Sequence, residues 1–424
     1  MIVLTNEEAQ ALDRRTIAAG TPPETLIERA AARVVEFLEA RFHLHQERVA
    51  VVSGKGNNGA DGREVERLLR ERNVRIVDES PTLIVDAVLG IGLRGEARGE
   101  ALERIRWIND QGAEVVAIDV PSGLGTGGEH VHATATVTFN VLKPVHVLPP
   151  WCDFCGEVVV TDIGLLPATS DLTQIDPPQF APRARGAHKG DFGHVLVIAG
   201  SPGKNGAAAM CGIAALRAGA GLTTVSAPVS SIYPELMTCD VDQLPLEGKT
   251  IVAIGPGLGV RPELVRPLYA ECPLPMVIDA DAITALGGWT LPPPPAPRIL
   301  TPHPGEFARI AAPVEDRVAD ARAFAQTNRV TLVLKGQRTV VAHPDGRVAI
   351  NPTGTPAMAK AGSGDILTGM IAGLYAQEPG ETAVEQAVWL HGRAGELGAV
   401  RWTERCLLAT DLLDFVPHAI RSAH

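Results

Sequence analysis

Short runs rich in valine and isoleucine alternate with helical stretches along most of this chain, and glycine-rich turns separate them. Alternation of this kind is typical of a parallel sheet with helices wound over both faces. In the first part of the chain the helical apolar spacing runs from Leu4 to Leu38 and recurs at Gly62–Arg72 and Glu100–Gln111. The strand-like runs there are Arg48–Val52, Val74–Val77, Leu83–Val88, Glu114–Ile118, Thr136–Thr138 and Val158–Thr161. We therefore expect a doubly wound α/β domain.

The stretch Pro167–Arg185 interrupts this pattern, because it is polar, contains four prolines and has no periodicity. A second α/β pattern follows it, with a β-hairpin expected around Pro344–Gly346. We therefore predict two domains, residues 1–166 and 187–424, joined by a linker at 167–186. The strand-like runs of the second domain are Val195–Gly200, Leu222–Ala227, Thr250–Ile254, Met276–Ile278, Arg298–Leu300, Thr331–Leu334, Thr339–His343 and Arg347–Asn351, with helices at Asp320–Thr327, Asp365–Tyr375 and Thr382–Val400.

Charge and cysteine usage exclude several classes of protein. A net charge of −11 argues against a nucleic-acid or anionic-membrane surface, and no apolar run is long enough to span a membrane. Cys152 and Cys155 form a CxxC, but the second pair that a zinc site needs is missing and the motif precedes a strand-like run. We read both as small loop residues of a reduced, cytoplasmic protein.

Three loops in the first domain follow strand-like runs and carry polar residues. The loop Gly54–Gly62 fits G-x-G-x-x-G, and Asp78 stands where the ribose-binding acid of a dehydrogenase would stand, so a dinucleotide site is one interpretation. That fingerprint does not require the polar side chains of Asn57, Asn58 and Asp61, which suggest contacts to a ligand or a hard cation instead.

The other two loops are Gly90–Glu96, which follows a run containing Asp86, and Asp119–Gly123. Each alone could be a turn or a helix cap. Because ligands of open α/β sheets bind beyond the carboxyl ends of the strands, we expect the three loops to share one crevice.

In the second domain, residues Asn351–Leu374 combine a glycine-rich loop with an apolar helix, and Asp365 stands at their junction. The unpaired amides of such a loop and first helical turn can surround an anion. A carboxylate beside them can accept the proton of a hydroxyl group that is being phosphorylated. The alternative is a helix-capping Asp after a flexible loop.

Further loops support a phosphoryl-transfer crevice. The segments Gly255–Gly259, Thr301–Glu306 and Lys335–Thr339 each follow a strand-like run, and Arg217–Leu222 ends a helix on a glycine turn. Singly, residues such as His303, Lys335 and Glu306 would be structural. Together the loops describe a nucleotide site without a Walker A motif or the protein-kinase motifs.

The segments GKGNNGADG, DAVLGIGLRG, AIDVPSGL and LKPVHVLPPWCDFCGEVVVTDIGL resemble the NAD(P)H-hydrate epimerase family over residues 1–166. The resemblance implies a Rossmann-like domain that interconverts the R and S forms of hydrated NAD(P)H. It also implies that Asp119 acts as acid or base at the hydrated ring, and that Asn58, Asp86 and Ser122 bind potassium. The implied substrate contacts are Asn57, Asn58, Gly59, Ala60, Asp61, Gly90, Ile91, Gly92, Leu93, Arg94, Gly95, Glu96 and Asp119. The chain departs from the family at Ala60, where glycine is usual, and by the apparent loss of one βα unit after Gly62–Arg72.

The segments HKGDFGHVLVIAGS, ALRAGAGLTTV, PELM, TPHPGEFARI, VLKGQRTVV and NPTGTPAMAKAGSGDILTGMIAGL resemble the ADP-dependent NAD(P)H-hydrate dehydratase family of the ribokinase-like superfamily, over His188 to Pro417. The resemblance implies a three-layer α/β/α domain that converts S-NAD(P)H-hydrate and ADP to NAD(P)H, AMP and phosphate. Asp365 would activate the ring hydroxyl, and Ala220, Gly257, His303 and Asp365 would contact the hydrate. ADP, with magnesium on its phosphates, would be bound by Lys335, Gly336, Gln337, Arg338, Thr339, Gly354, Thr355, Pro356, Ala357, Met358, Ala359, Lys360, Ala361, Gly362, Ser363 and Gly364. Ala357 replaces a family glycine, a change that we expect the loop to tolerate.

The sequence therefore predicts a bifunctional repair enzyme that acts on a small-molecule substrate, NAD(P)H-hydrate, and forms a homo-oligomer. Two other interpretations stay open. The second domain could be a ribokinase-like kinase for a stable alcohol. The shortened first domain could be a non-catalytic module for oligomerisation or dinucleotide sensing.

Overall fold

The computed structural model describes residues 1–229 and 232–423. Its internal contacts divide the chain into two compact units, Met1–Leu172 and Thr173–His424. The division falls inside the stretch that the sequence marks as a linker. Part of that stretch also forms structure, because β6 (Leu172–Gln174) joins the sheet of the second unit and Ile175 is buried in its core.

The first unit is built on a five-stranded sheet in the order β1-β2-β3-β4-β5, and all its neighbouring strands are parallel. The strands are β1 (Val49–Ser53), β2 (Leu83–Ala87), β3 (Glu114–Ile118), β4 (Ala135–Phe139) and β5 (Glu157–Thr161). The predicted parallel sheet is therefore confirmed. The predicted strand Val74–Val77 is wrong, since this segment makes only an isolated bridge from Ile76 to Val49. Asn73 and Ser80, which flank this segment, both have a left-handed φ, so only a short length of backbone between them can be extended.

Helices cover both faces of this sheet. Val49, Leu83 and Val85 face α2 and α3, whereas the alternate residues Ala50 and Ile84 pack with α4. The helices are α1 (Asn6–Ala18), α2 (Pro23–Arg41), α3 (Asn57–Glu71), α4 (Glu100–Asp110) and α5 (Pro144–Val147), with short 3-10 turns η1 (Leu44–Gln46) and η2 (Trp151–Phe154).

The single helical stretch expected from Leu4 to Leu38 is two helices. Gly20 has a left-handed φ of 109°, and the proline pair Pro22–Pro23 allows a new helix to start but not an old one to continue. Helix α1 begins with a capping box, because Glu8 N–H donates to Thr5 Oγ1 at 3.3 Å and Thr5 N–H donates to Glu8 Oε2 at 2.9 Å.

The second unit has a ten-stranded sheet in the order β6-β15-β14-β13-β12-β11-β10-β7-β8-β9. The pairs among β7 to β13 are all parallel, whereas β13 pairs antiparallel with β14. The predicted hairpin appears as the antiparallel pair β14 and β15. The strands are β7 (His194–Ile198), β8 (Leu222–Val225), β9 (Met237–Thr238), β10 (Ile251–Ile254), β11 (Met276–Ile278), β12 (Arg298–Leu300), β13 (Thr331–Leu334), β14 (Val340–Ala342) and β15 (Val348–Ile350).

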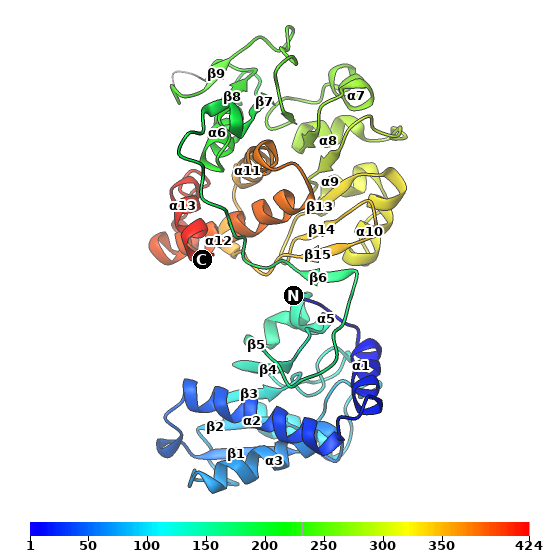
Figure 1. Ribbon diagram of the computed structural model, residues 1–424, viewed down its shortest axis with the longest axis vertical. Coiled ribbons are helices and arrows are strands. Elements are labelled where there is room, and N and C mark those ends of the chain that lie inside the picture. Colours follow the sequence, from blue (N-terminus) through cyan, green and yellow to red (C-terminus); the bar gives the residue numbers. More distant parts are fainter. Residues whose placement is uncertain (230–231, 424) are drawn as a thin grey trace. The chain divides into compact units, whose positions relative to one another are not determined.

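Helices on both faces make this unit a three-layer α/β/α domain (Figure 1). One face carries α6 (Asn205–Arg217), α11 (Ser363–Gln377), α12 (Glu381–Cys406) and α13 (Leu412–Ser422), which share a core with the sheet. The other face carries α7 (Pro262–Glu271), α8 (Ala280–Leu286), α9 (Pro304–Ile310) and α10 (Arg317–Asn328), and the short turns are η3 (Lys189–Phe192) and η4 (Pro356–Met358).

Helix α11 lies deep in the domain and packs closely on α6. A Cβ atom on Gly369 would lie 2.1 Å from the carbonyl oxygen of Cys211, so only glycine allows the two helices to approach this far. This packing fixes the N-terminal end of α11, where Asp365 lies.

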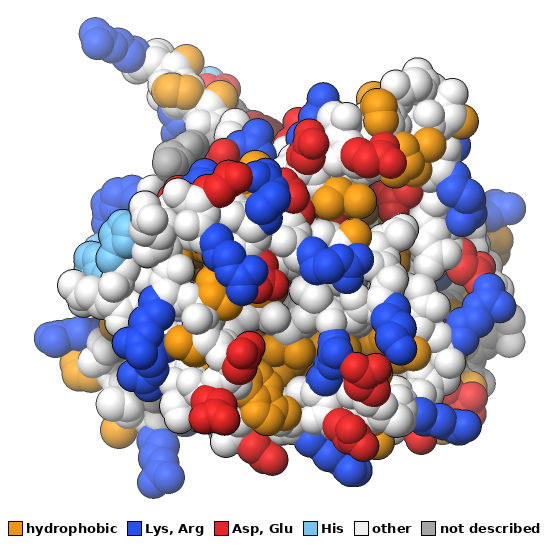
Figure 2. Space-filling model, turned by 90° about the horizontal axis from the view of Figure 1, so that it is seen from below, with side chains coloured by type: hydrophobic (Ala, Val, Ile, Leu, Met, Phe, Trp, Pro, Cys, Tyr) orange, Lys and Arg blue, Asp and Glu red, His pale blue; other side chains and the backbone are white. Residues whose placement is uncertain are grey.

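The lengths and apolar character of the helices bear on the prediction that the chain has no membrane span. Among the described residues, none of the helices combines the length and apolar character needed to cross a bilayer. On the face drawn in Figure 2, basic and acidic side chains are interspersed. Cys152 and Cys155 are both buried at the η2 turn, as small residues there would be.

Candidate active sites

A cavity of about 740 Å³ opens in the first unit beside α1, α2 and the loops that follow β1, β2 and β3. Its wall includes nine residues that the sequence singled out, so the expected shared crevice exists. They are Asn57, Asn58, Asp61, Gly90, Ile91, Gly92, Leu93, Arg94 and Asp119. The remaining predicted contacts, Gly59, Ala60, Gly95 and Glu96, do not line it.

The glycines of the first loop have a packing role. A Cβ on Gly54 would lie 1.9 Å from the carbonyl oxygen of Val88, and a Cβ on Gly59 would lie 1.9 Å from that of Gly54. Ala60 fits within α3 without strain, since its φ is not left-handed. Asp78, the candidate ribose-binding acid, is exposed and lies outside the cavity wall. The dehydrogenase interpretation therefore lacks the acidic residue that would bind the ribose.

Asp119 is held in the cavity wall by a dense set of contacts. It follows β3 with a left-handed φ of 65°, a conformation that few residues other than glycine adopt. Its carboxylate forms an ion pair with Lys143 and accepts a hydrogen bond from the Thr138 hydroxyl at 2.9 Å. His146 Nε2 lies 2.9 Å from its carbonyl oxygen. Strain that so many contacts hold in place is typical of a functional residue.

The Lys143 ion pair keeps Asp119 ionised. Burial alone would raise the pKa of Asp119, but the charge and hydrogen bond of Lys143 outweigh it, and the pKa lies below its usual value. Both side chains are largely enclosed, at 3% exposed for Lys143 and 14% for Asp119. Burial lowers the pKa of His146 to about 3, so that ring is neutral and can donate from Nε2 while its Nδ1 accepts from the Lys143 amide.

Two further carboxyl groups lie in the same wall. Burial, followed by the charges of Asp119 and Asp13, raises the pKa of Asp61 to about 8. Burial and the charge of Asp119 also raise the pKa of Asp13, a residue of α1. The cavity thus contains an ionised carboxylate and a neighbouring carboxyl group that keeps its proton at neutral pH. Such separated pKa values are characteristic of acid–base pairs.

The three residues predicted to hold potassium lie close together: Asp86 in β2, Ser122 in the loop after β3, and Asn58 in the first turn of α3. Asp86 is fully buried, and its carboxylate accepts from the Ser122 amide at 2.8 Å and the Ser122 hydroxyl at 2.6 Å. Asn58 donates from Nδ2 to the Leu89 carbonyl oxygen at 3.0 Å, which leaves its buried Oδ1 without a hydrogen-bond partner among the described residues. Burial raises the pKa of Asp86 to about 6, although the hydrogen bonds from Ser122 lower it.

In the second unit, charged residues gather at the carboxyl ends of the parallel strands. Asp279 follows β11, Lys335 follows β13, and Glu306 lies in the first turn of α9. Lys335 Nζ is 2.7 Å from Asp279 Oδ1 and 3.6 Å from Glu306 Oε2. Asp365, in the first turn of α11, is close enough to interact with all three charges.

Asp365 has the electrostatic surroundings of a general base. Burial and then the charge of Asp279 raise the pKa of Asp365, Lys335 opposes them, and the resulting pKa is about 6. At neutral pH this carboxylate is ionised yet more basic than an ordinary Asp, as a proton acceptor should be.

The loop before α11 presents free amides. Within residues 1–229 and 232–423, no hydrogen bond engages the backbone N–H groups of Ala361, Gly362, Gly364 and Asp365. Gly362 adopts a left-handed φ of 95°, which turns the chain into the helix. Free amides at the positive end of a 15-residue helix make an anion site directly beside Asp365.

Other residues predicted to bind ADP serve to hold this loop. Lys360 Nζ donates to the carbonyl oxygens of Arg405 and Leu407, both at 2.6 Å. The amide of Gly354 donates to Glu396 at 2.9 Å, and Arg338 Nη1 donates to the Pro352 carbonyl oxygen at 3.0 Å.

The other predicted members of the ADP loop have local roles. Thr339 donates to the Gly336 carbonyl oxygen at 3.0 Å, and Thr355 caps η4, where Ala357 is buried without a left-handed φ. The replacement of the family glycine at Ala357 therefore causes no backbone strain. Gln337, Pro356, Met358, Ala359, Ser363 and Gly364 complete the segments.

Two of the remaining predicted hydrate contacts reach this site. His303 caps α9 and its Nε2 lies 3.5 Å from Glu306. Gly257 packs against Lys204, which pairs with Asp281 at 3.6 Å. Ala220 does not, because it precedes β8 and so lies at the amino edge of the parallel sheet, opposite the strand ends that carry the charged residues.

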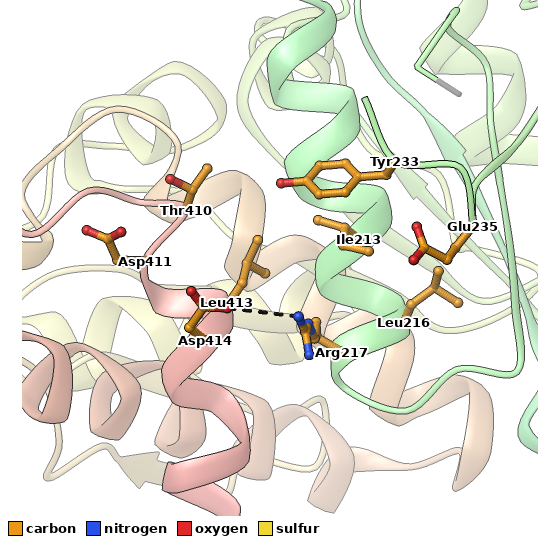
Figure 3. A pocket seen from close by; sticks show the side chains of 9 residues that line it. All are labelled: Ile213, Leu216, Arg217, Tyr233, Glu235, Thr410, Asp411, Leu413 and Asp414. Atoms are coloured by element: carbon orange, nitrogen blue, oxygen red, sulfur yellow. Dashed lines mark ion pairs between the residues drawn. The ribbon is translucent and has the colours of Figure 1, made fainter. Parts of the chain in front are cut away.

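A separate hollow of about 580 Å³ lies between α6, α13 and the segment around Tyr233 (Figure 3). Arg217 and Asp414 form an ion pair of 3.9 Å across it. Apart from Arg217, which begins the predicted glycine turn Arg217–Leu222, none of the predicted site residues is among its described lining.

Sequence reasoning missed three residues that the fold brings to these sites. Asp13 and Lys143 flank Asp119, and Asp279 binds Lys335. Lys143 and Asp279 each follow a strand-like run closely, and this position could have marked them as site residues. Asp13 lies in mid-helix and gave none.

Comparisons with known proteins agree with this architecture. A sequence model of the family described as NAD(P)H-hydrate dehydratase matches residues 195–418. One described as YjeF-related protein N-terminus matches residues 23–79 and 75–145. The two stretches overlap at 75–79, as expected if this chain lacks a segment that the family has there.

Among solved structures, the ADP/ATP-dependent NAD(P)H-hydrate dehydratase from Bacillus subtilis, co-crystallised with ATP and Mg²⁺, is 35% identical with a TM-score of 0.54. The match covers 58% of this chain and 95% of that protein. A ribokinase-like superfamily protein from Enterococcus faecalis is 27% identical with a TM-score of 0.53, and covers 61% of this chain and 98% of its own. The second unit therefore has the ribokinase-like fold.

Curated relatives match both units. The bifunctional NAD(P)H-hydrate repair enzyme Nnr of Moorella thermoacetica is 37% identical over 515 aligned positions, covering 100% of this chain and 97% of that protein. Since the alignment is longer than the 424 residues here, the relative has segments that this chain lacks. The Escherichia coli enzyme of the same name is 35% identical over 85% of this chain and 83% of its own length. This chain belongs to the family of bifunctional NAD(P)H-hydrate repair enzymes.

Proposed function

We propose that this protein repairs hydrated nicotinamide cofactors at two sites. Residues 187–424 dehydrate S-NAD(P)H-hydrate with ADP as phosphoryl donor, and residues 1–166 interconvert the R and S hydrates. The pairing is chemically sensible, because hydration produces both epimers whereas the dehydratase consumes one. The observation that carries the proposal is the set of free amides at Ala361, Gly362, Gly364 and Asp365, with the Asp365 carboxylate beside them.

In the dehydratase site, hydroxide is a poor leaving group, and phosphorylation of the ring hydroxyl solves that problem. Asp365 accepts the hydroxyl proton while the oxygen attacks the terminal phosphorus of ADP, and AMP leaves. The lone pair of the ring nitrogen then expels phosphate, and loss of a C5 proton restores NAD(P)H. The free amides hold the phosphate of the nucleotide in place during transfer.

The proposed contacts of the hydrate are Gly257, His303 and Asp365. The proposed contacts of the nucleotide are the segments Lys335–Thr339 and Gly354–Gly364. Ala220 is not included, since the sheet places it at the opposite edge. Magnesium would enter with the nucleotide, because the described residues contain no group of three or more His, Cys, Asp or Glu side chains that could hold a metal ion. Bound there, it neutralises phosphate charge.

In the epimerase site, inversion at C6 requires the hydroxyl to leave from one face and water to add to the other. We propose that protonated Asp61 donates a proton to the departing hydroxyl, and that ionised Asp119 accepts a proton from the incoming water. The roles exchange in the reverse direction. Lys143 keeps Asp119 ionised, and the cavity lined by Asn57 and Gly90–Arg94 holds the dinucleotide.

The donor set around Asp86 fits a potassium ion. The buried Oδ1 of Asn58 has no hydrogen-bond partner in the described part of the chain, and the carboxylate of Asp86 and the hydroxyl of Ser122 supply further oxygen atoms. A bound cation would offset the burial of the Asp86 charge and fix the loops that line the cavity.

The test is incubation of the full chain with a mixture of R- and S-NADH hydrate, with ADP, with ATP or with neither nucleotide. We expect the NADH absorbance band to return with a nucleotide and not without one, and an Asp365→Asn variant to lose this recovery. No recovery with either nucleotide would favour the kinase interpretation. The first domain is tested by incubation of the chain with one pure epimer in the absence of nucleotide, followed by chromatographic separation of the epimers. If the other epimer forms no faster than without protein, the first domain has a non-catalytic role.

A further inference from the structure

One buried carboxylate links three elements of the dehydratase site. Asp279 is 1% exposed and follows β11. Its Oδ1 is 2.7 Å from Lys335 Nζ, at the end of β13, and its Oδ2 accepts a hydrogen bond of 2.8 Å from the hydroxyl of Thr368 on α11. Thr368 lies one helical turn after Asp365, so Asp279 connects the lysine to the helix that carries the proposed base.

The Lys335 ammonium has little freedom in this arrangement. Glu306 Oε2 lies on the other side of the ammonium, 3.6 Å from Lys335 Nζ. The Lys335 side chain is only 19% exposed. Gly364 comes close as well, since a Cβ there would lie 3.3 Å from Lys335 Nζ and 3.7 Å from Asp279 Oδ2. The ion pair therefore packs directly under the first turn of α11, below the free amides.

The backbone around Asp279 is also constrained. A Cβ on Gly255 would lie 1.9 Å from the Asp279 carbonyl oxygen, so glycine is needed there to let the two loops meet. Ala280, the next residue, has a left-handed φ of 49°. Strain and close packing beside a buried charge point to a role beyond stability.

We propose that Asp279 is a positioning residue of the dehydratase site, whose buried carboxylate fixes the Lys335 ammonium and the first turns of α11 against each other. It does not touch the reacting atoms. The inference rests on the proposed dehydratase function and extends it by naming a residue that acts through Lys335 and Asp365.

Asp279 also affects the strength of the base. The charged and titratable groups that face Asp365 are Asp279 and Asp281 near the end of β11, Lys335 after β13, Glu306 on α9 and Cys211 on α6. Removal of the Asp279 charge takes away a like charge and leaves Lys335 unopposed on that side. Both changes favour ionised Asp365, so its pKa falls.

The experiment compares the pH dependence of ADP-dependent NADH recovery in the wild-type chain and in Asp279→Asn. The acidic limb of kcat/KM reports ionisation of the base. We expect this limb to move to lower pH by on the order of one unit in the variant. We also expect a raised KM for ADP, because Lys335 is no longer held. A purely structural role would lower the rate at every pH and leave the limb in place.

Two variants keep the test decisive. Thr368→Val removes only the hydroxyl donor, so the limb should stay at the wild-type pH. Lys335→Met removes the cation, so the limb should move to higher pH, and this prediction holds even if Asp279→Asn does not fold. An unmoved limb in a folded Asp279→Asn, or in Lys335→Met, overturns the inference alone. A wild-type chain without nucleotide-dependent recovery refutes the proposed function and this inference with it.

Discussion

Replacement of Lys143 by methionine should damage both the stability and the activity of the first unit. Methionine keeps most of the length of the side chain but removes the charge. Asp119 would then remain buried at 14% exposure without its cation. An unpaired buried charge is strongly unfavourable, so Asp119 should take up a proton instead.

The magnitude follows from the cost of that proton. An unfolded Asp has a pKa of about 3.9, and each unit corresponds to about 1.4 kcal/mol. To keep Asp119 protonated at pH 7 therefore costs about 4 kcal/mol, and at pH 5 about 1.5 kcal/mol. The contribution of Asp119 to stability therefore changes with pH in the opposite direction to that in the wild type. There, the depressed pKa of Asp119 stabilises the fold above the unfolded pKa, and the contribution is lost as the pH falls through the folded pKa.

Urea denaturation at several pH values measures this effect, with the unfolding of the first unit followed separately. The loss of stability in Lys143→Met should shrink as the pH falls from 7 to 5. Epimer exchange at pH 7 should fall by roughly 10²- to 10⁴-fold, the usual contribution of a catalytic acid or base. Lys55→Met is the matched stability control, because Lys55 is 94% exposed and its pair with Glu100 should contribute under about 1 kcal/mol. A Lys143→Met variant as stable as this control at pH 7 would refute the reasoning.

Three further outcomes are expected. Since Asp365 must be ionised and its pKa is about 6, dehydration should reach a plateau above pH 7 and fall to about a tenth of it at pH 5; a flat profile from pH 5 to 8 would contradict this role. Epimer exchange should decline above pH 8 as Asp61 loses its proton, and Asp61→Asn should abolish this alkaline limb along with most of the rate; an unaltered limb in the variant would assign it to another group. Replacement of potassium by lithium should slow epimer exchange and lower the melting temperature of the first unit, whereas Asp86→Asn should be insensitive to the exchange of cations; equal sensitivity of variant and wild type would remove potassium from this site.

The repeating elements of the fold could be predicted because their signals are local. The strand Glu114–Ile118 coincides with its prediction, and the helix expected at Asp365–Tyr375 lies within α11. Errors arose where one residue outweighs a pattern. Gly20 and the following prolines divide the first helix, and left-handed Asn73 and Ser80 prevent a strand that Val74–Val77 would otherwise form.

The sites were predicted only in part, for a related reason. Residues in strand-end loops, such as Asp119 and Lys335, could be placed because a parallel sheet brings those loops to one edge. Their partners lie far away in the sequence, as Asp13 and Asp279 do, and only the fold shows that they meet. The same rule that located the strand ends would have excluded Ala220, which precedes its strand.

The most direct test of two separate sites in one chain is complementation between two inactive variants. Pure R-NADH hydrate is incubated with ADP and with Asp119→Ala, Asp365→Asn or an equal mixture of both full-length proteins. Each variant alone should restore NADH no faster than uncatalysed epimer exchange allows, because one cannot form the S epimer and the other cannot dehydrate it. The mixture should restore NADH at a rate close to that of the wild type. No gain from mixing, or recovery of NADH by either variant alone faster than uncatalysed epimer exchange, would contradict the account.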